Sequence, residues 1–528
     1  MSTAATAPSR RPVARVAGRL GRRRPALGSV LIVLAVLLGL LARLHSPSAL
    51  WLDEALSLGI ARRPVPELLD ALRRDGSPPV YYLLLHGWIA AFGSSDTAVR
   101  ALSTVLSFAA LPLVWLAGRR LGGPPTGRAA MLLLAVSPFA VRYATETRMY
   151  ALVQLLGAAG LFALLRALER PSPWRLLPVG LIAGLLALTH YWALFLLAAT
   201  ALVLLAVARR GDRSAYRVLA ALSAGAVLFL PWLPTFLFQI RRTGTPWAPV
   251  PKLVDVWYSV TGWAGGGGGP AVLLTLLLLG LALLALVGSA QGRSVVLGTK
   301  VDRTALLLLA GSAGTLVLGL AVGRVVAAGY APRYSSVAIV PALVLAALGL
   351  RALPPRARTT ALVLVAVSGL LSSLPQLTST RRTQAAVTAA ALRAGLAPGD
   401  VVAYCPDQLG PAVSRLLPAG TDQVVYPSFA APELIDWVDY AERNATASPT
   451  AFARDLSARS PGSLWLVSAG GYLTFGSQCE QLAEALVDLR GRGLAVQRQS
   501  GSYDEQQAVT RYPALGSSAP VGGAGTPR

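Results

Sequence analysis

The chain has 528 residues, of which 54% are hydrophobic and only 14% carry a charge. This balance excludes an ordinary soluble globular protein and predicts a polytopic α-helical membrane protein. The formal net charge of +24 does not indicate nucleic-acid binding, because the arginines gather in short connectors between apolar segments and no basic, aromatic-rich surface is present. That placement is typical of the cytoplasmic loops of membrane proteins.

Residues 1–25 contain a run of arginines and no acid, which predicts a basic tail on the cytoplasmic side of the membrane. The first apolar segment, residues 26–44, is just long enough to cross roughly 30 Å of hydrocarbon. A cleaved signal peptide is the alternative. The apolar segment is long, however, and no clean small-x-small cleavage site follows it, so we expect an uncleaved first helix.

Residues 45–96 form the first predicted outer loop, which carries Trp51-Leu52-Asp53-Glu54. Ionisable groups at the membrane boundary are costly to keep near lipid and therefore usually carry function. Adjacent residues of a helix point about 100° apart, so the two carboxylates are not expected to serve one small site. Asp53 is the first candidate and Glu54 the second. The alternative is an acidic helix N-terminus that the helix dipole favours.

The same loop continues with Ser77-Pro78-Pro79, which predicts the start of a helix over residues 80–92, because proline is accepted in a first helical turn. This apolar segment is decorated by Tyr82 and His86 and is too short to cross the bilayer. A helix that lies along the membrane surface is therefore expected.

From residue 97 onward, apolar segments alternate with short loops, and the arginine-rich loops define the cytoplasmic side. The pattern predicts about eleven spans within residues 26–376, with an error of one or two. An odd count places the C-terminal region on the same side as Asp53. Arg381-Arg382, directly after the last span, count mildly against this orientation. The outer loop before Pro270 contains a five-glycine run and is expected to be mobile.

Polar residues at the span ends are distributed unevenly. The inner ends contain little besides arginine, whereas the outer ends carry acids, arginines, a histidine and tyrosines: Asp53, Glu54, Arg142, Glu146, Arg148, Tyr150, His190, Tyr191, Arg324, Arg333 and Tyr334. This asymmetry predicts an active or binding site on the outer face. Fixed guanidinium groups there run against the usual charge bias and suit a phosphate that arrives on a lipid.

Two of these groups have a structural alternative. Arg142, Glu146 and Tyr150 recur every four residues, so on a helix they share one face, while Arg148 points elsewhere. This pattern is also that of a helix start stabilised by its own ion pairs. His190 either binds a ligand or is a satisfied structural histidine, and the sequence leaves both open.

Residues 377–512 have the composition of a soluble domain and alternate between helix and strand patterns, which predicts a small extracytoplasmic α/β domain. Cys405 follows a predicted strand and Cys479 opens a predicted helix, so a disulfide is favoured in an oxidising exterior, with two free buried thiols as the alternative. Residues 513–528, rich in Gly, Pro, Ser and Ala, are expected to be disordered.

Four motifs occur in order: the Asp-Glu pair after the first span, Ser-Pro-Pro-Val-Tyr-Tyr at 77–82, Ser-Pro-Phe at 137–139 followed by the segment 145–152, and Thr-His-Tyr at 189–191. Together they resemble the GT-C membrane glycosyltransferases, specifically bacterial relatives of the protein O-mannosyltransferases and lipid A aminoarabinose transferases. The resemblance covers residues 26–350 and is strongest over 51–192. The C-terminal domain lies outside it.

The resemblance implies transfer of a mannose-like sugar or a pentose from a polyprenyl-phosphate donor to an acceptor hydroxyl, on the outer face of a bacterial plasma membrane and with inversion. Asp53 falls on the family's catalytic acid and would act as general base. The leaving phosphate would be bound by Arg148 and Arg333, with Arg142 and Arg324 as further candidates. Substrate contacts are expected from Glu146, Tyr150, His190, Tyr191, Tyr82 and Tyr334.

No cofactor is expected, because the chain contains no Asp-x-Asp triplet to hold a divalent ion and a nucleotide diphosphate. Some GT-C members use a metal, but the outer acids here are too few to indicate one. The expected partners are the lipid-linked donor, a lipid, glycan or protein acceptor, and membrane lipid. The alternative from another class is a lipid or sugar transporter without transferase activity, which would need polar groups at mid-membrane.

Overall fold

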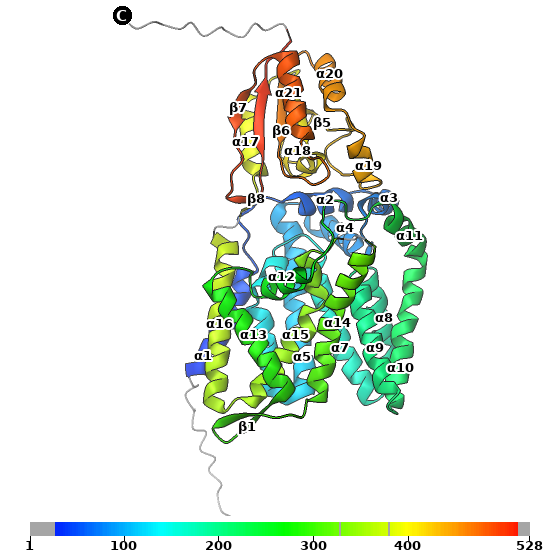
Figure 1. Ribbon diagram of the computed structural model, residues 1–528, viewed down its shortest axis with the longest axis vertical. Helices are drawn as coiled ribbons and strands as arrows, with labels where there is room; N and C mark the ends of the chain where they lie inside the picture. Colours follow the sequence, from blue (N-terminus) through cyan, green and yellow to red (C-terminus); the bar gives the residue numbers. More distant parts are fainter. Residues whose placement is uncertain (1–26, 327–328, 379–380, 516–528) are drawn as a thin grey trace, which may run out of the picture.

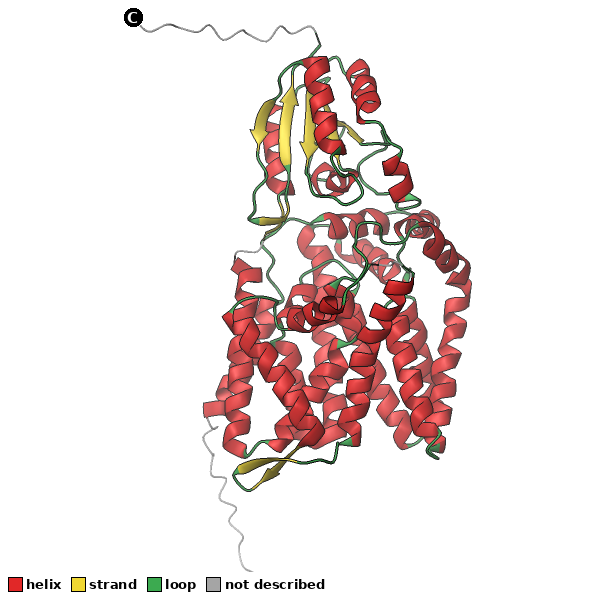
Figure 2. Cartoon of the chain, in the orientation of Figure 1, coloured by secondary structure: helices red, strands yellow, loops and turns green. Residues whose placement is uncertain are grey.

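The computed structural model describes residues 27–326, 329–378 and 381–515. Figures 1 and 2 show a helical bundle with a smaller, sheet-containing domain stacked on one end of it. We call this end of the bundle the outer end, following the predicted orientation. The predicted basic tail and nearly all of the predicted disordered tail lie outside the described residues.

Apolar helices form the bundle, which agrees with the predicted fold class. Six helical segments of the described chain are long and apolar enough to cross a membrane: α5 (Asp96–Ala135), α7 (Tyr150–Glu169), the continuous run α10 (Arg213–Ala224), η1 (Gly225–Trp232) and α11 (Leu233–Arg242), α13 (Gly269–Val287), α14 (Arg303–Val325) and α16 (Pro355–Thr378). Shorter apolar helices pack among them: α1 (Leu27–Ala42), α8 (Pro173–Ala187), α9 (Ala193–Ala208) and α15 (Ile339–Gly349). The count of about eleven spans stays a prediction.

Helix α5 contains two of the predicted spans. Gly122 and Gly123 have non-helical backbone angles, and Gly123 has a φ of 79°, which glycine adopts readily. A Cβ atom at Gly118 would lie 3.1 Å from the Cβ of Ala130. Residues so far apart in the sequence approach this closely only if the chain turns back, so α5 is a tight hairpin of two helical arms.

Short helices cover the outer end of the bundle, below the C-terminal domain: α2 (Leu52–Ala61), α3 (Val65–Asp75), α4 (Val80–Phe92) and α12 (Leu253–Trp263). Helix α4 has the predicted bounds. Helix α12 lies within the loop that was expected to be mobile. Gly265, just after α12, has a φ of 104°, and a Cβ atom there would lie 3.1 Å from the Cβ of Ser372. The glycine run therefore includes a packed turn.

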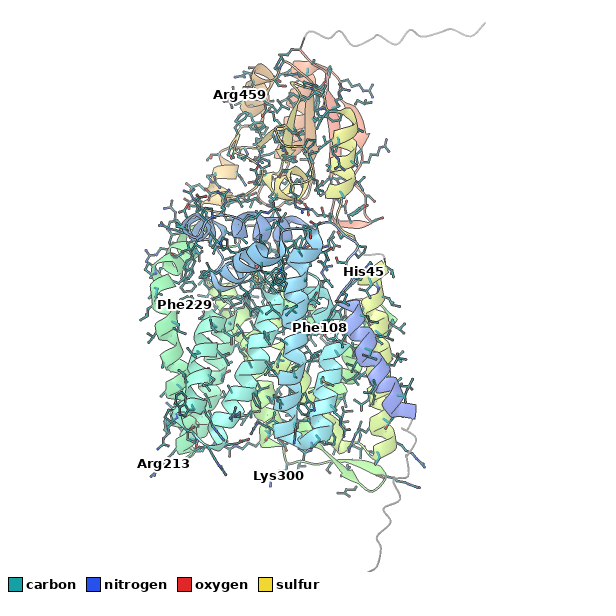
Figure 3. The ribbon with its side chains drawn as sticks, turned by 180° about the vertical axis from the view of Figure 1, so that it is seen from behind. His45, Phe108, Arg213, Phe229, Lys300 and Arg459 are labelled. Atoms are coloured by element: carbon teal, nitrogen blue, oxygen red, sulfur yellow. A yellow bond between two sulfur atoms is a disulfide. The ribbon has the colours of Figure 1, made fainter. Side chains whose placement is uncertain are left out.

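The basic connectors lie at the other end of the bundle. Figure 3 shows Arg213 and Lys300 at the end opposite the C-terminal domain, whereas Arg459 belongs to that domain. The connector before α14 also contains a hairpin of β1 (Gly288–Gln291) and β2 (Ser294–Leu297). The arginine-rich loops and the C-terminal domain are thus at opposite ends, as the predicted orientation requires.

The C-terminal domain is built on a five-stranded sheet in the order β5 (Asp422–Val425), β4 (Val401–Cys405), β6 (Leu464–Ser468), β9 (Ala508–Tyr512) and β7 (Leu494–Gln497). Strand β4 is parallel to β5 and β6, whereas β9 is antiparallel to both of its neighbours. The principal helices of the domain are α17 (Ala385–Gly395), α18 (Gly410–Ser414), α20 (Pro449–Arg459) and α21 (Gln478–Arg490). A disulfide joins Cys405 at the end of β4 to Cys479 in α21.

Within this domain, the sequence pattern predicts a helix over residues 433–443, and this prediction is wrong for its first half. The structure has only a short helix α19 (Tyr440–Ala445) there. The preceding residues bind the bundle through their backbone, since Trp437 N–H donates to the carbonyl of Arg74 and Asp439 N–H donates to that of Arg242. Backbone groups used in this way are not available for helix formation. An ion pair of 3.1 Å between Arg74 and Asp436 reinforces the contact.

Candidate active site

Asp53 lies at the outer end of the bundle, in the first turn of α2, between two arginines. Its Oδ2 atom is 3.8 Å from Arg148 Nε and 3.8 Å from Arg333 Nη2. Arg148 comes from the connector before α7, and Arg333 comes from the 3₁₀ helix η2 (Pro332–Val337). The Asp53 side chain is 15% exposed. Three elements far apart in the sequence thus bring one carboxylate and two guanidinium groups together. We call these three residues and the side chains packed around them the Asp53 cluster.

Several polar atoms of this cluster are buried without a hydrogen-bond partner among the described residues. They are Trp51 Nε1, Asp53 Oδ2, Arg148 Nε, Tyr150 Oη and Arg333 Nε. Buried polar atoms of folded proteins are nearly always paired, so each exception needs an explanation. A group of exceptions at one place, with both donors and a carboxylate oxygen, fits a site built to bind a polar, anionic ligand.

Arg148 is held in position by hydroxyl groups from two helices. Its Nη1 atom donates to Tyr82 Oη at 3.1 Å and lies 3.3 Å from Ser57 Oγ. Ser57 is one helical turn beyond Asp53 on α2, and Tyr82 is a fully buried residue of α4. The hydroxyl of Tyr82, expected to contact substrate, is therefore engaged with Arg148.

Aromatic rings surround Arg333. Its guanidinium carbon lies 5.1 Å from the ring centre of Trp247, 5.6 Å from that of Tyr334 and 5.9 Å from that of Trp51. A cation over aromatic faces is attracted by their electron density while its N–H groups stay free for another partner. Trp247 lies in the outer loop before α12 and was not among the predicted site residues.

Asp75 is a second carboxylate of the cluster that the sequence analysis missed. It ends α3, and its side chain hydrogen-bonds to Ser77 and Tyr82. Burial raises the pKa of Asp75, the positive charge of Arg148 opposes this effect, and the charge of Asp53 adds to it. Its position directly before Gly-Ser-Pro-Pro at 76–79, in the loop that carries Asp53, was the signal that pointed to it.

Glu54 points away from the cluster into a buried ion-pair network. Arg100 donates to both of its carboxylate oxygens, at 2.6 and 2.8 Å, and the backbone N–H of Thr147 donates at 3.0 Å. Burial alone would raise the pKa of Glu54, but Arg100 and Arg382 outweigh burial and lower it. A carboxylate whose two oxygens already accept three hydrogen bonds is poorly placed to take a proton from substrate. The structure therefore does not support a catalytic role for Glu54.

The helix expected to carry Arg142, Glu146 and Tyr150 on one face is interrupted. Helix α6 (Pro138–Ala144) ends before Glu146, and α7 begins at Tyr150. Arg142 still pairs with Glu146 at 3.2 Å, but Tyr150 belongs to a different helix. The break has a physical cause, because the Thr145 carbonyl accepts from Arg382 at 2.7 Å and the Thr147 N–H donates to Glu54. These backbone groups are not available to continue the helix.

His190 lies between two tyrosines at the edge of the cluster. Its ring centre is 5.2 Å from that of Tyr334 and 5.7 Å from that of Tyr150, and its Nδ1 accepts from the Trp192 N–H at 3.1 Å. Burial lowers the pKa of His190 to about 3, and the charges of Arg148 and Arg333 act in the same direction. His190 is therefore neutral at physiological pH.

Besides Glu54, the predicted site residues Tyr191 and Arg324 lie outside the cluster. The Tyr191 hydroxyl is turned toward Gln239 and accepts from the indole N–H of Trp232 at 2.9 Å. Arg324 is exposed, and its hydrogen bond goes to the carbonyl of Pro251 at 3.4 Å. Both lie on the outer side, which is all that the sequence pattern indicated. Neither contacts Asp53, Arg148 or Arg333 in the described structure.

Metal ligands do not gather in this region. Within the described ranges, no three side chains of His, Cys, Asp or Glu form a group that could hold an ion. The charge facing Asp53 comes from Arg148 and Arg333 instead.

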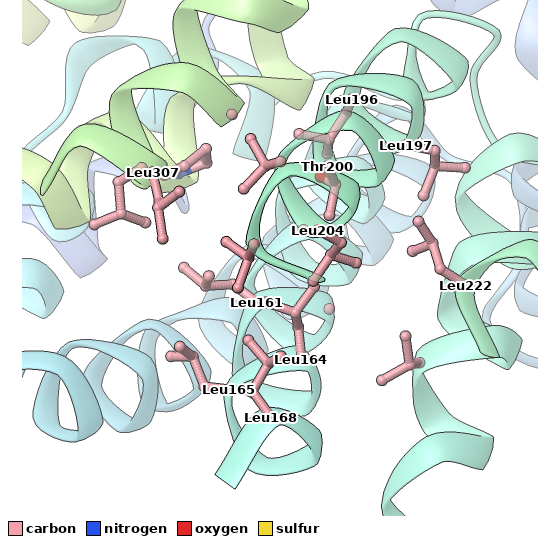
Figure 4. Close-up of a pocket in the computed structure, with 18 of the residues that line it drawn as sticks. Leu161, Leu164, Leu165, Leu168, Leu196, Leu197, Thr200, Leu204, Leu222 and Leu307 are labelled. Carbon is pink, nitrogen blue, oxygen red and sulfur yellow. The ribbon is translucent and has the colours of Figure 1, made fainter. Parts of the chain in front are cut away.

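A separate apolar cavity of about 370 Å³ lies within the bundle, between α7, α8, α9 and α14. Figure 4 shows leucines from these helices, among them Leu161, Leu204 and Leu307, pointing into it. Its lining contains none of the residues of the Asp53 cluster. The cavity is lined mostly by apolar side chains and suits hydrocarbon, although Asp212 and Arg303 are also among its lining residues.

The comparisons with known proteins concern both sequence and fold. Residues 76–235 match the family model of the dolichyl-phosphate-mannose-protein mannosyltransferases. That segment includes Tyr82 and Arg148 but neither Asp53 nor Arg333. No curated protein sequence matches the chain. The crystal structure of ArnT from Cupriavidus metallidurans in the apo state superposes with a TM-score of 0.63 at 14% identity, over 92% of this chain and 97% of that one. The structure of the same protein bound to undecaprenyl phosphate gives a TM-score of 0.60 at 12% identity, with the same coverage.

Proposed function

We propose that this chain is a GT-C membrane glycosyltransferase and that it transfers a sugar from a polyprenyl-phosphate donor to an acceptor hydroxyl at the outer end of the bundle. Its fold and the family-model match over residues 76–235 support this proposal. The observation that carries the proposal is the convergence of Asp53, Arg148 and Arg333, each of which has a buried polar atom without a hydrogen-bond partner. The binding of undecaprenyl phosphate by ArnT, a protein of the same fold, supports a lipid-borne phosphate.

In the proposed reaction, Asp53 is the general base. The oxygen of the acceptor hydroxyl forms a bond to the anomeric carbon of the sugar and gives its proton to the Asp53 carboxylate. The bond between the anomeric carbon and the phosphate oxygen breaks, and the polyprenyl phosphate leaves with the electron pair. The negative charge of the phosphate group increases by one in this step.

Arg148 and Arg333 stabilise that departing charge. Charge-assisted hydrogen bonds to phosphate oxygens are short and strong, and a planar guanidinium offers two parallel donors. Preorganised donors aimed at a developing negative charge are commonly the largest contribution to catalysis. The Tyr82 hydroxyl fixes Arg148, and the aromatic rings around Arg333 fix the second cation, so both are preorganised.

A single displacement with inversion at the anomeric carbon fits this arrangement. Retention through a covalent intermediate needs a second carboxylate close to the first and facing the sugar. Glu54 is engaged with Arg100, and Asp75 is hydrogen-bonded to Ser77 and Tyr82. Of Asp53, Glu54 and Asp75, only Asp53 has a buried carboxylate oxygen without a hydrogen-bond partner, and Glu146, whose Oε1 is also unpartnered, is paired with Arg142 through Oε2.

A transporter is the alternative function. It would need its polar groups at mid-membrane, where a substrate passes between the two sides. The charged cluster instead lies at one end of the bundle, beneath the C-terminal domain. The cavity within the bundle is lined mainly by leucine and other apolar residues, which disfavours the passage of a sugar.

The test is sugar transfer from a radiolabelled polyprenyl-phosphate sugar in membranes, with Asp53→Asn compared with wild type. We expect Asp53→Asn to lower the rate by at least roughly 10²-fold, because the asparagine cannot accept the proton. Asp70→Asn is the matched control, since Asp70 is an acid of the same outer loop with a 64% exposed side chain. Turnover retained in a normally expressed Asp53→Asn variant would rule out Asp53 as the general base.

A further inference from the structure

A two-stranded parallel sheet connects the C-terminal domain to the active site. Strand β3 (Arg381–Thr383) pairs with β8 (Tyr503–Glu505), with Thr383 opposite Glu505. The label β8 in Figure 1 marks this sheet at the junction between the domain and the bundle. Arg382 and Glu505 extend from it to two different elements of the site.

Glu505 caps the helix that carries Asp53. Its Oε2 atom accepts from the backbone N–H of Leu52 at 3.1 Å. The first N–H groups of a helix have no partner within the helix, and Trp51 at the N-cap position of α2 provides no side-chain bond. Glu505 is 7% exposed and hydrogen-bonded to Thr383 and Gln507. The cap of α2 thus comes from the C-terminal domain.

Arg382 binds the connector that carries Arg148. Its Nη1 donates to the carbonyl of Thr145 and its Nη2 donates to Thr145 Oγ1, both at 2.7 Å. The same guanidinium is 3.5 Å from Glu54 on α2, and the backbone N–H of Arg382 donates to Ser48 Oγ at 3.1 Å. Arg382 is 4% exposed. One buried residue therefore fixes the connector between α6 and α7 relative to α2.

We infer that the sheet β3–β8 positions the active site, with Glu505 fixing Asp53 through the start of α2 and Arg382 fixing Arg148 through Thr145. Both are positioning residues, since neither is placed to touch substrate. The inference rests on the proposed function and gives the C-terminal domain a role in it. Catalytic groups must be held to about 0.5 Å, and a displacement of about 1 Å can lower a rate roughly 10²-fold.

The test compares Glu505→Ala and Glu505→Gln in the full-length protein. Glu505→Ala removes the acceptor for the Leu52 N–H, so kcat is expected to fall at least about tenfold while the KM for the donor changes less than about twofold. Glu505→Gln keeps an acceptor oxygen and is expected to restore most of the rate. Glu484→Ala is the matched control, because Glu484 is an exposed glutamate on α21 of the same domain.

Hydrogen exchange provides a readout that does not depend on activity. In Glu505→Ala, the first-turn amides of α2 should exchange faster than in wild type, and in Glu505→Gln they should stay close to wild type. Unchanged exchange would overturn the cap, and faster exchange with unchanged kcat would overturn the positioning role. A wild type that transfers no sugar would refute the proposed function instead, and the exchange data would still decide the cap.

Arg382→Lys serves if Glu505→Ala does not accumulate as folded protein. Lysine keeps the charge but has no second, parallel donor for Thr145. We expect a lower kcat, an unchanged donor KM and faster exchange over residues 145–149. Wild-type values for both kcat and exchange would overturn the inference.

Discussion

Two adjacent carboxylates have opposite environments in this protein. Asp53 Oδ2 faces two guanidinium groups at a distance longer than a hydrogen bond and has no hydrogen-bond partner. Both Glu54 oxygens, in contrast, accept hydrogen bonds from Arg100, and one also accepts from the Thr147 N–H. The difference arises from helix geometry, since neighbouring side chains of α2 project in different directions. Asp53 is thereby available for chemistry, and Glu54 holds the elements around it.

The roles of the arginines can be separated by substitution. Arg148→Gln removes a charge that faces Asp53, so the binding of the lipid phosphate should weaken, and the KM for the donor should rise at least about tenfold with a lower kcat. Arg324→Gln is the control, because Arg324 is an exposed outer arginine outside the cluster. The measurement is the dependence of initial rate on donor concentration. An unchanged donor dependence in Arg148→Gln would exclude the phosphate role.

The helices and strands whose bounds the sequence predicted best are those with local start and stop signals. Helix α4 begins directly after Pro78-Pro79 and ends before Gly93, so its bounds were predicted. The short apolar run at 464–468 likewise predicts a strand, and β6 has these bounds. The connector over 145–149 could not be predicted in the same way. Arg142, Glu146 and Tyr150 recur at helical spacing, but the connector is not helical, because Arg382 and Glu54 bind its backbone from distant positions in the chain.

The ion pair between Glu54 and Arg100 joins α2 to α5, and its loss should affect stability more than chemistry. Glu54→Gln leaves the buried Arg100 charge without its partner, which typically costs about 3–5 kcal/mol. We expect a lower melting temperature in detergent, while the kcat of the remaining folded protein falls far less than in Asp53→Asn. Glu67→Gln, at an exposed outer position, is the control. A normal melting temperature combined with a kcat as low as that of Asp53→Asn would contradict this assignment.

At the scale of the whole molecule, the sequence indicated which residues face the outer side but not which of them meet. Asp53, Arg148 and Arg333 were grouped because all three are polar and lie at outer span ends. Tyr191 and Arg324 satisfy the same criterion and lie elsewhere. The positions of Asp75 and Trp247 depend on how α3 and the loop before α12 fold over the bundle. Such contacts have no local sequence signal.

The stability of the C-terminal domain should depend on pH through Asp407. Burial raises the pKa of this carboxyl to about 7 from its ordinary value of 3.8, and the hydrogen bond from the Tyr440 hydroxyl partly opposes this effect. The folded state therefore binds the proton more tightly, and the free energy of unfolding decreases as pH rises from about 4 to about 7. The difference between the two pKa values corresponds to roughly 4 kcal/mol.

Asp407→Asn should reduce this pH dependence, because asparagine does not ionise. The check is thermal unfolding of the purified protein at pH 5 and pH 7.5, followed by circular dichroism. Asp422→Asn, an exposed position at the start of β5, is the control. An equal loss of melting temperature in wild type and Asp407→Asn would refute the role of Asp407.

The pairing of β3 with β8 has a consequence for biosynthesis. A ribosome that has translated the chain through α16 has already made Asp53, Arg148 and Arg333, yet the residue that caps α2 is more than a hundred codons away. A prematurely terminated polypeptide therefore contains Asp53, Arg148 and Arg333 but lacks Glu505, which caps α2. On the positioning inference, such a chain should transfer sugar more slowly than the full-length protein, and its rate should rise once the last strands are made.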